Sequence, residues 1–113
     1  MYEYAVTIVR VVDGDTVDVD IDLGFEVTLK NQRVRLIGID APETRTRDPE
    51  EKARGIASKN FVESLLPIGS QQYLISREYH GERGKYGRIL GDFKIEDNAL
   101  TDLMVLHGHA TFM

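Results

Sequence analysis

Several features that would narrow the class of this protein are missing from its sequence. The 113 residues include no cysteine, which excludes disulfides and thiolate-bound metals and leaves the redox compartment open. The apolar runs are only a few residues long, far short of the roughly 20 residues that a membrane-spanning helix needs. No repeat, linker or low-complexity segment divides the sequence. The length therefore predicts one domain with one hydrophobic core, covering residues 1–113.

A surplus of basic charge is also missing. The sequence has 14 Lys and Arg against 19 Asp and Glu, which gives a formal net charge of −5. Non-specific binding of nucleic acids usually depends on basic surfaces, so a broad electrostatic contact with phosphates is not expected. A local site remains open, because a bound divalent cation reverses the sign of the field around it.

The N-terminal residues contain neither the basic start nor the apolar segment of a secretion signal. The localisation therefore stays open. A protein of the cytoplasm or of a mobile element is the favoured interpretation, and a trimmed form of a secreted protein is the alternative.

The pattern of apolar residues predicts five strands. Residues 6–12 are rich in β-branched side chains, and residues 16–22 alternate between apolar and acidic side chains, as a half-buried strand does. The third strand covers 26–29 and 33–39 with an interruption near Asn31, and the last two cover 73–77 and 88–93. The acidic face of the second strand, formed by Asp18, Asp20 and Asp22, is expected to be solvated.

A first helix is predicted to begin at Asp48. Asp48 suits the cap, Pro49 suits the first turn, and Glu51 stands where it would complete a capping box. The helix is expected to end near Leu66. Its buried face is predicted from residues at four-residue spacing: Ala53, Ala57, Phe61 and Leu65.

A second helix is predicted near the end of the sequence. Asp97 or Asn98 would cap it, and it would run through His107 and stop at Gly108. Five short strands, with one helix after the third and another near the end, favour a mainly β member of the α+β class. We expect a five-stranded Greek-key barrel of the OB type with two packed helices.

Two carboxylates are candidates for a metal site. Asp15 lies on a predicted turn between two strands, and Asp40 ends another strand. Carboxylates brought close together need a cation, because their repulsion otherwise raises the pKa of one of them. Hard oxygen ligands suit Ca²⁺ or Mg²⁺, whereas the three histidines show no spacing typical of zinc. In the simpler alternative, Asp15 only closes its turn and Asp40 only ends its strand.

Arg35, Glu43 and Arg88 have the side chains that phosphodiester hydrolysis requires. Guanidinium groups match phosphate oxygens and stay charged, so two of them would stabilise the charge that develops during the reaction. A carboxylate beside a metal-bound water orients it or takes its proton. Each residue also has a simpler interpretation: a solvent-facing strand arginine, a loop carboxylate and a hairpin residue.

Three motifs together resemble the staphylococcal nuclease (thermonuclease) family. They are Asp13-Gly-Asp-Thr16, the segment from Arg35 to Asp40-Ala-Pro-Glu-Thr-Arg45, and Lys85-Tyr-Gly-Arg88. The resemblance covers nearly the whole chain and implies the same barrel. It also implies that Asp15 and Asp40 bind Ca²⁺ with the main-chain carbonyl of Ala41, where the family usually has threonine.

The same resemblance implies the roles of the remaining residues. Glu43 would hold the attacking water, and Arg35 and Arg88 would clamp the phosphate. Lys85 and Tyr86 would contact a terminal phosphate of bound nucleotide, and a loop without a ligand is their alternative interpretation.

The expected function is that of a Ca²⁺-dependent phosphodiesterase. The resemblance implies cleavage of DNA and RNA without sequence specificity, a preference for single strands, and 3′-phosphate ends. The alternatives are a non-catalytic OB-type module that binds nucleic acid or protein, and a protein-interaction role. Family members normally continue with a third helix, which is expected to be absent after Met113. A homo-oligomer or a partner protein would then cover that surface.

Overall fold

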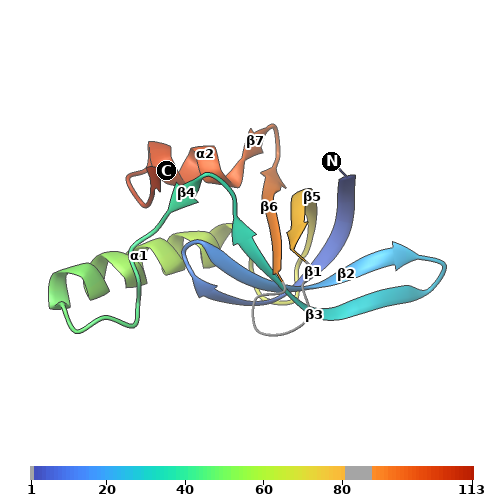
Figure 1. The fold of residues 1–113 in the computed structure, drawn as a ribbon, viewed down its shortest axis with the longest axis horizontal. Helices are drawn as coiled ribbons and strands as arrows, with labels where there is room; N and C mark the ends of the chain where they lie inside the picture. Colours follow the sequence, from blue (N-terminus) through green and yellow to red (C-terminus); the bar gives the residue numbers. More distant parts are fainter. Residues whose placement is uncertain (1, 81–87) are drawn as a thin grey trace.

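The computed structural model describes residues 2–80 and 88–113 and contains a barrel with two helices (Figure 1). The long strands are β1 (Tyr2–Asp13), β2 (Thr16–Gly24), β3 (Val27–Leu36), β5 (Gln71–His80) and β6 (Arg88–Ile95). Three strands have two residues each: β4 (Ile39–Asp40), β7 (Asn98–Ala99) and β8 (Thr111–Phe112). The helices are α1 (Pro49–Leu65) and α2 (Leu100–Leu106).

Six strands form one sheet in the order β3-β2-β1-β5-β6-β7, and β4 pairs with β8 in a second. The pairs in the large sheet are antiparallel except for a parallel contact between β3 and β6, which brings the two sides of the sheet together. The mainly β, OB-type barrel with two helices is therefore confirmed. The predicted third strand is divided, because the chain turns at Ile37 and Gly38 before β4 begins.

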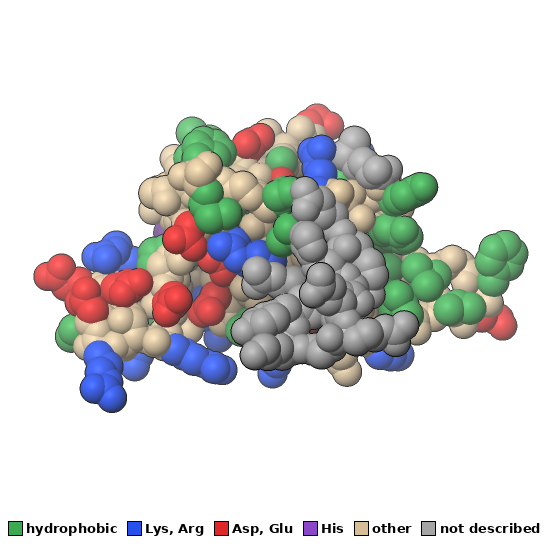
Figure 2. Space-filling model, viewed as in Figure 1, with side chains coloured by type: hydrophobic (Ala, Val, Ile, Leu, Met, Phe, Trp, Pro, Cys, Tyr) green, Lys and Arg blue, Asp and Glu red, His purple; other side chains and the backbone are tan. Residues whose placement is uncertain are grey.

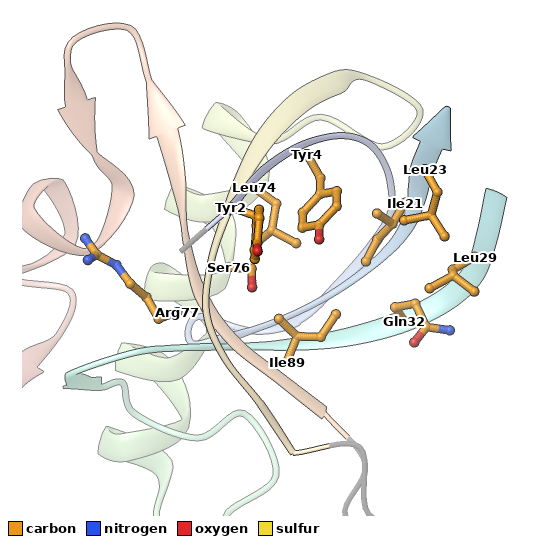
Figure 3. Close-up of a pocket in the computed structure, with 10 residues that line it drawn as sticks. All are labelled: Tyr2, Tyr4, Ile21, Leu23, Leu29, Gln32, Leu74, Ser76, Arg77 and Ile89. Atoms are coloured by element: carbon orange, nitrogen blue, oxygen red, sulfur yellow. The ribbon is translucent and has the colours of Figure 1, made fainter. Parts of the chain in front are cut away.

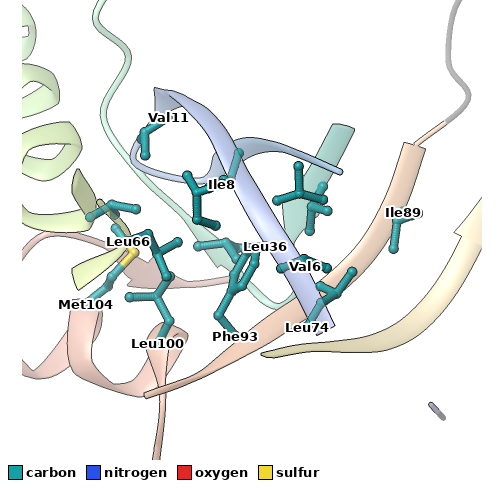
Figure 4. Packing of buried hydrophobic residues seen from close by; sticks show 14 of the residues in the cluster. Val6, Ile8, Val11, Leu36, Leu66, Leu74, Ile89, Phe93, Leu100 and Met104 are labelled. Carbon is teal, nitrogen blue, oxygen red and sulfur yellow. The ribbon is translucent and has the colours of Figure 1, made fainter. Parts of the chain in front are cut away.

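The alternating pattern of β2 correctly predicted which side chains enter the core. Val17, Val19 and Ile21 are buried inside the barrel, where Figure 4 shows the packing of the buried cluster. Phe93 and Leu36 lie in the same cluster. Val62 of α1 and its C-cap residue Leu66 join it, as do Leu100 and Met104 of α2. Both helices are therefore fixed to the barrel through apolar contacts, the dominant favourable contribution to folding.

The β2–β3 hairpin extends well beyond the barrel (Figure 1). Its tip contains three consecutive residues with positive φ angles, Gly24, Phe25 and Glu26, and the Phe25 side chain is fully exposed. The interruption predicted near Asn31 is instead a bulge within one continuous strand. Asn31 has a positive φ angle there, and its N–H donates to Asp20.

Asp48 caps α1 as predicted, because its carboxylate accepts a hydrogen bond from the N–H of Glu50 at 3.0 Å. The predicted capping box does not form. Glu51 instead accepts from the hydroxyl of Thr46, and the N–H of Asp48 donates to that same hydroxyl. The Thr46 hydroxyl thus lies between the carboxylate of Glu51 and the N–H of Asp48, which a capping box would have joined directly.

The predicted buried face of α1 is also wrong. Gly55, Ser58 and Val62 are buried, whereas Ala53 and Ala57 are exposed. Phe61 and Leu65 are only partly buried. Gly55 explains the difference, since a Cβ added there would lie 2.3 Å from the carbonyl oxygen of Glu43. The helix packs so closely on the preceding loop that it contacts the loop through its smallest residue.

The predicted caps of α2 are wrong, and its predicted stop at Gly108 is confirmed. The N-cap residue is Ala99, which provides no side-chain hydrogen bond. The carboxylate of Asp92, buried on β6, accepts from the main-chain N–H and the hydroxyl of Thr101 in the first turn. Burial has the largest effect on the pKa of Asp92 and raises it, although the hydrogen bonds from Thr101 and Phe93 act in the opposite direction.

Within residues 2–80 and 88–113, neither helix combines the length and the apolar character needed to cross a bilayer.

The Gly55→Ala variant tests the close contact between α1 and its preceding loop. Alanine is the better helix former by about 1 kcal/mol. Its methyl group would collide with backbone atoms of Glu43, and overpacking of this kind costs about 1–3 kcal/mol. We expect a lower free energy of unfolding, measured in urea.

Asn60→Ala on the exposed side of α1 is the control, and we expect it to gain about 0.5 kcal/mol from helix propensity. A Gly55→Ala protein that is more stable than the wild type would contradict the described contact.

Candidate functional site

The guanidinium group of Arg35 joins three segments at one end of the barrel. Its Nη1 donates to the carbonyl oxygens of Leu36 at 2.8 Å and Ile39 at 2.9 Å. Its Nη2 lies 3.4 Å from Oδ2 of Asp15 and 3.3 Å from Oδ1 of Asp40. Only 16% of the side chain is exposed. The interpretation of Arg35 as a solvent-facing strand residue is therefore wrong.

Asp15 lies on the tight turn between β1 and β2 and is buried. Its Oδ2 accepts from the N–H of Ala41 at 3.1 Å, and its Oδ1 accepts from the hydroxyl of Thr16 at 3.0 Å. Gly14 permits this approach, because a Cβ there would lie 2.9 Å from Cβ of Ser58 and 3.1 Å from that of Ala41. The hydrogen bond from Ala41 thus holds Asp15 against the segment that carries Asp40. The side chain of Asp40 itself is 65% exposed.

The donor set of this pair is suited to Ca²⁺. Asp15 and Asp40 approach the same nitrogen of Arg35 from different segments, so the positive charge that now lies between them is a guanidinium group. Ca²⁺ takes six to eight oxygen ligands, and carboxylates and main-chain carbonyls are among its usual ones. Within the described residues, no group of three or more His, Asp or Glu side chains is placed to hold a metal. Further oxygens would have to come from the main chain, such as the carbonyl of Ala41, from water or from substrate.

Glu43 lies on the exposed loop between β4 and α1. Two contacts fix this loop. The hydroxyl and the N–H of Thr44 both donate to Oδ1 of Asp13, at 2.6 Å and 3.3 Å, and Gly55 of α1 packs on the backbone of Glu43. The sequence singled out Asp13 only as the first residue of the Asp13-Gly-Asp-Thr16 motif. Its position two residues before Asp15 was the only available signal, and that signal gave no indication of its partner.

The second part of the predicted site follows β5. Lys85 and Tyr86 lie outside the described residues. Arg88 is the first residue of β6. β6 runs parallel to β3 there, and Leu90, two positions after Arg88, is in register with Arg35.

The acidic face of β2 is not a freely solvated surface. Asp18 is buried, and both of its oxygens accept hydrogen bonds from arginine side chains, those of Arg10 and Arg33. The neighbouring Asp20 lies 3.5 Å from Nζ of Lys30. Of the three predicted solvated residues, Asp22 alone is exposed, and it accepts from the N–H of Gly24. The prediction therefore fails where β3 places basic side chains opposite β2.

These contacts set the pKa of Asp18. Burial has the largest single effect and would raise it. The hydrogen bonds and charges of Arg33 and Arg10 together outweigh burial, so the pKa lies below its ordinary value.

A hollow of about 430 Å³, lined mainly by apolar side chains, lies elsewhere in the molecule (Figure 3). Tyr2, Tyr4, Leu23 and Leu29 line it, and Figure 2 shows hydrophobic side chains gathered at the end that carries the hairpin. Charged side chains gather at the opposite end, which carries α1 (Figure 2). The hollow lacks the converging carboxylates and cations of the Arg35 cluster, so it is not the candidate reaction site.

Residues 33–113 match the family described as "Staphylococcal nuclease homologue". The matched segment includes Arg35, Asp40 and Glu43 and begins after Asp15.

The chain is also similar to curated proteins over part of their length. The chain is 38% identical to the thermonuclease of Staphylococcus intermedius over 72% of its own length and 43% of the relative. It is 32% identical to the thermonuclease of Staphylococcus hyicus, over 78% of the chain and 47% of the relative. It is 34% identical to protein ParB of Escherichia coli, over 74% and 38%. The chain therefore spans less than half the length of each of these relatives.

The pairing of Asp18 with two arginines predicts a specific pH dependence of stability. The folded pKa of Asp18 is lower than that of the unfolded chain, about 3.9. Its stabilising contribution is thus complete above pH 4 and is lost as the pH falls through the folded pKa. We expect wild-type protein to be more stable than Asp18→Asn at neutral pH. The difference should shrink below pH 4 by at most about 1.4 kcal/mol per pH unit.

Asp92→Asn provides a control of opposite sign. The folded pKa of Asp92 is raised, so the wild type gains stability relative to this variant as the pH falls through that pKa towards 4. Urea unfolding at a series of pH values measures both differences. A wild-type advantage over Asp18→Asn that stays constant down to pH 2 would contradict the role given to the arginines.

Proposed function

Since the chain belongs to the staphylococcal nuclease homologue family, we propose that it is a nuclease that hydrolyses phosphodiester bonds in DNA and RNA. We further propose that it requires Ca²⁺, prefers single strands and leaves 3′-phosphate ends. The observation that carries the proposal is the convergence of Asp15, Arg35 and Asp40 at one guanidinium nitrogen. This convergence joins a phosphate-binding cation to a pair of carboxylates suited to a divalent metal.

Each residue has a role that follows from its position. Asp15 and Asp40, with the carbonyl of Ala41, would hold Ca²⁺, which would neutralise phosphate charge and activate water when bound. Arg35 would bind a phosphate oxygen, and Arg88 would bind the same phosphate from β6. Lys85 and Tyr86 would contact the neighbouring part of the nucleotide.

Glu43 would orient the attacking water or accept its proton. Its exposed position leaves its carboxylate accessible to substrate and water. The hydrogen bonds of Thr44 to Asp13 and the contact with Gly55 fix its backbone, which supports a positioning role that requires a fixed geometry.

Digestion of heat-denatured DNA at low salt tests the whole proposal. We expect cleavage in Ca²⁺ and its loss when a calcium chelator is added, because the carboxylate pair would then lack its cation. Electrophoresis of the products measures both results. Binding of DNA by folded protein without cleavage would favour the non-catalytic OB-type module, and neither binding nor cleavage would overturn the proposal.

Glu43→Gln tests the proposed base while preserving the size of the side chain. We expect the cleavage rate to fall by about 10²–10⁴-fold, the usual contribution of general acid–base catalysis. Glu50→Gln is the matched control, since Glu50 is also exposed and lies in the first turn of α1, outside the proposed site. Single-turnover kinetics give the rates, and urea unfolding verifies that both variants fold. Wild-type turnover in Glu43→Gln would remove Glu43 from the mechanism.

A further inference from the structure

Arg10, Asp18 and Arg33 form a row across three neighbouring strands. Asp18 on β2 is in register with Arg10 on β1 and with Arg33 on β3. Nε of Arg10 lies 2.9 Å from Oδ2 of Asp18, and Nε of Arg33 lies 2.9 Å from Oδ1. Nη2 of Arg33 adds a contact of 3.1 Å to Oδ2. One carboxylate therefore fixes two guanidinium groups, and the row retains one positive charge.

In this row the two arginine side chains are exposed and the aspartate side chain is nearly buried. The Asp18 side chain is only 11% exposed, whereas those of Arg10 and Arg33 are 61% and 46% exposed. The three residues line one shallow hollow with Val9 and Asn31. A ligand that approaches this surface meets guanidinium groups, which are planar donors that match phosphate oxygens.

The row is continuous with the candidate active site. Arg33 and Arg35 are two residues apart on β3, so their side chains share one face of the strand, about 6.7 Å apart along it. Arg35 contacts Asp15, Arg33 contacts Asp18, and beyond them Lys30 contacts Asp20. We call these three pairs the ion-pair ladder. In the second and third pairs, the cation is more exposed than its carboxylate.

We propose that Arg10 and Arg33 form a second phosphate site, which binds the backbone of a single-stranded nucleic acid next to the phosphate held by Arg35. The inference rests on the proposed function, because it assumes a nucleic-acid substrate. The distance between Arg33 and Arg35 along the strand suits successive phosphates of an extended single strand. Asp18 holds both arginines in place before the substrate arrives, which reduces the entropy lost on binding.

This site also accounts for how an acidic chain would bind a polyanion. The net charge of −5 predicts repulsion at long range. Asp18 and Asp20 lie beneath their basic partners, so a strand bound there would contact positive groups at short range.

The salt dependence of binding tests this site independently of cleavage. The probe is a fluorescently labelled oligothymidine, and the binding constant is measured by anisotropy between 50 and 200 mM salt with a calcium chelator present. The test variant is Arg10→Gln/Asp18→Asn/Arg33→Gln, in which no carboxylate is left buried without its partners. We expect weaker binding and a slope of log K against log salt that is smaller by about 0.7, the value for one phosphate contact to a single strand.

Two further variants make the result specific. Lys94→Gln changes the net charge by the same amount as the triple variant, and Lys94 pairs with Glu3 on another part of the barrel surface. We expect its slope to equal that of the wild type. Arg10→Lys/Arg33→Lys keeps both charges and should keep the slope. Circular dichroism confirms that each variant folds.

The outcomes separate this inference from the proposed function. An unchanged slope in the triple variant would overturn the second phosphate site, even if the protein cleaves DNA. An equal loss of slope in Lys94→Gln would also overturn it, because the effect would then reflect net charge alone. A reduced slope confined to the triple variant supports the site, even if the protein cleaves nothing and the proposed nuclease activity fails.

Discussion

The candidate site depends on the guanidinium group of Arg35. It joins the end of β3 to the carbonyl oxygens of Leu36 and Ile39 and to the carboxylates of Asp15 and Asp40. The two carboxylates can lie close together because a positive charge lies between them. Its low exposure strengthens these interactions, since the surrounding protein screens charge less than water does. The same side chain supports the fold and carries the phosphate-binding role of the proposed function, so substitution of Arg35 would not separate the two.

Local sequence patterns predicted the parts of the fold that depend on local chemistry. The alternation at Val17, Val19 and Ile21 gave the inner face of β2, and Asp48 with Pro49 gave the start of α1. The errors involve partners that are distant in the sequence or elements with unexpected packing. Asp92 caps α2 from nine residues away, and Asp13 holds Thr44 from 31 residues away. No periodicity within one element contains that information, because it arises when separate elements pack together.

The sequence identified the residues of the candidate site but not the contacts between them. The motifs identified Asp15, Arg35 and Asp40, which the fold brings together. Composition gave a net charge of −5, yet it could not reveal that Asp18 and Asp20 lie beneath basic side chains. Total charge sets the field at a distance, whereas contact depends on which side chains face outward. The ion-pair ladder thus exposes positive groups on one face of the barrel, although the net charge of the sequence is negative.

The cap of α2 has a consequence for how the protein unfolds. Seven residues are too few for a helix that is stable alone, because nucleation is unfavourable and few hydrogen bonds follow it. At the N-terminus of α2, Thr101 donates its hydrogen bonds to Asp92 on β6, and Leu100 and Met104 pack in the barrel core. The helix therefore cannot persist once the barrel opens. Its amide protons should exchange with solvent through the same global opening as those of β6, which makes α2 part of one cooperative unit with the barrel.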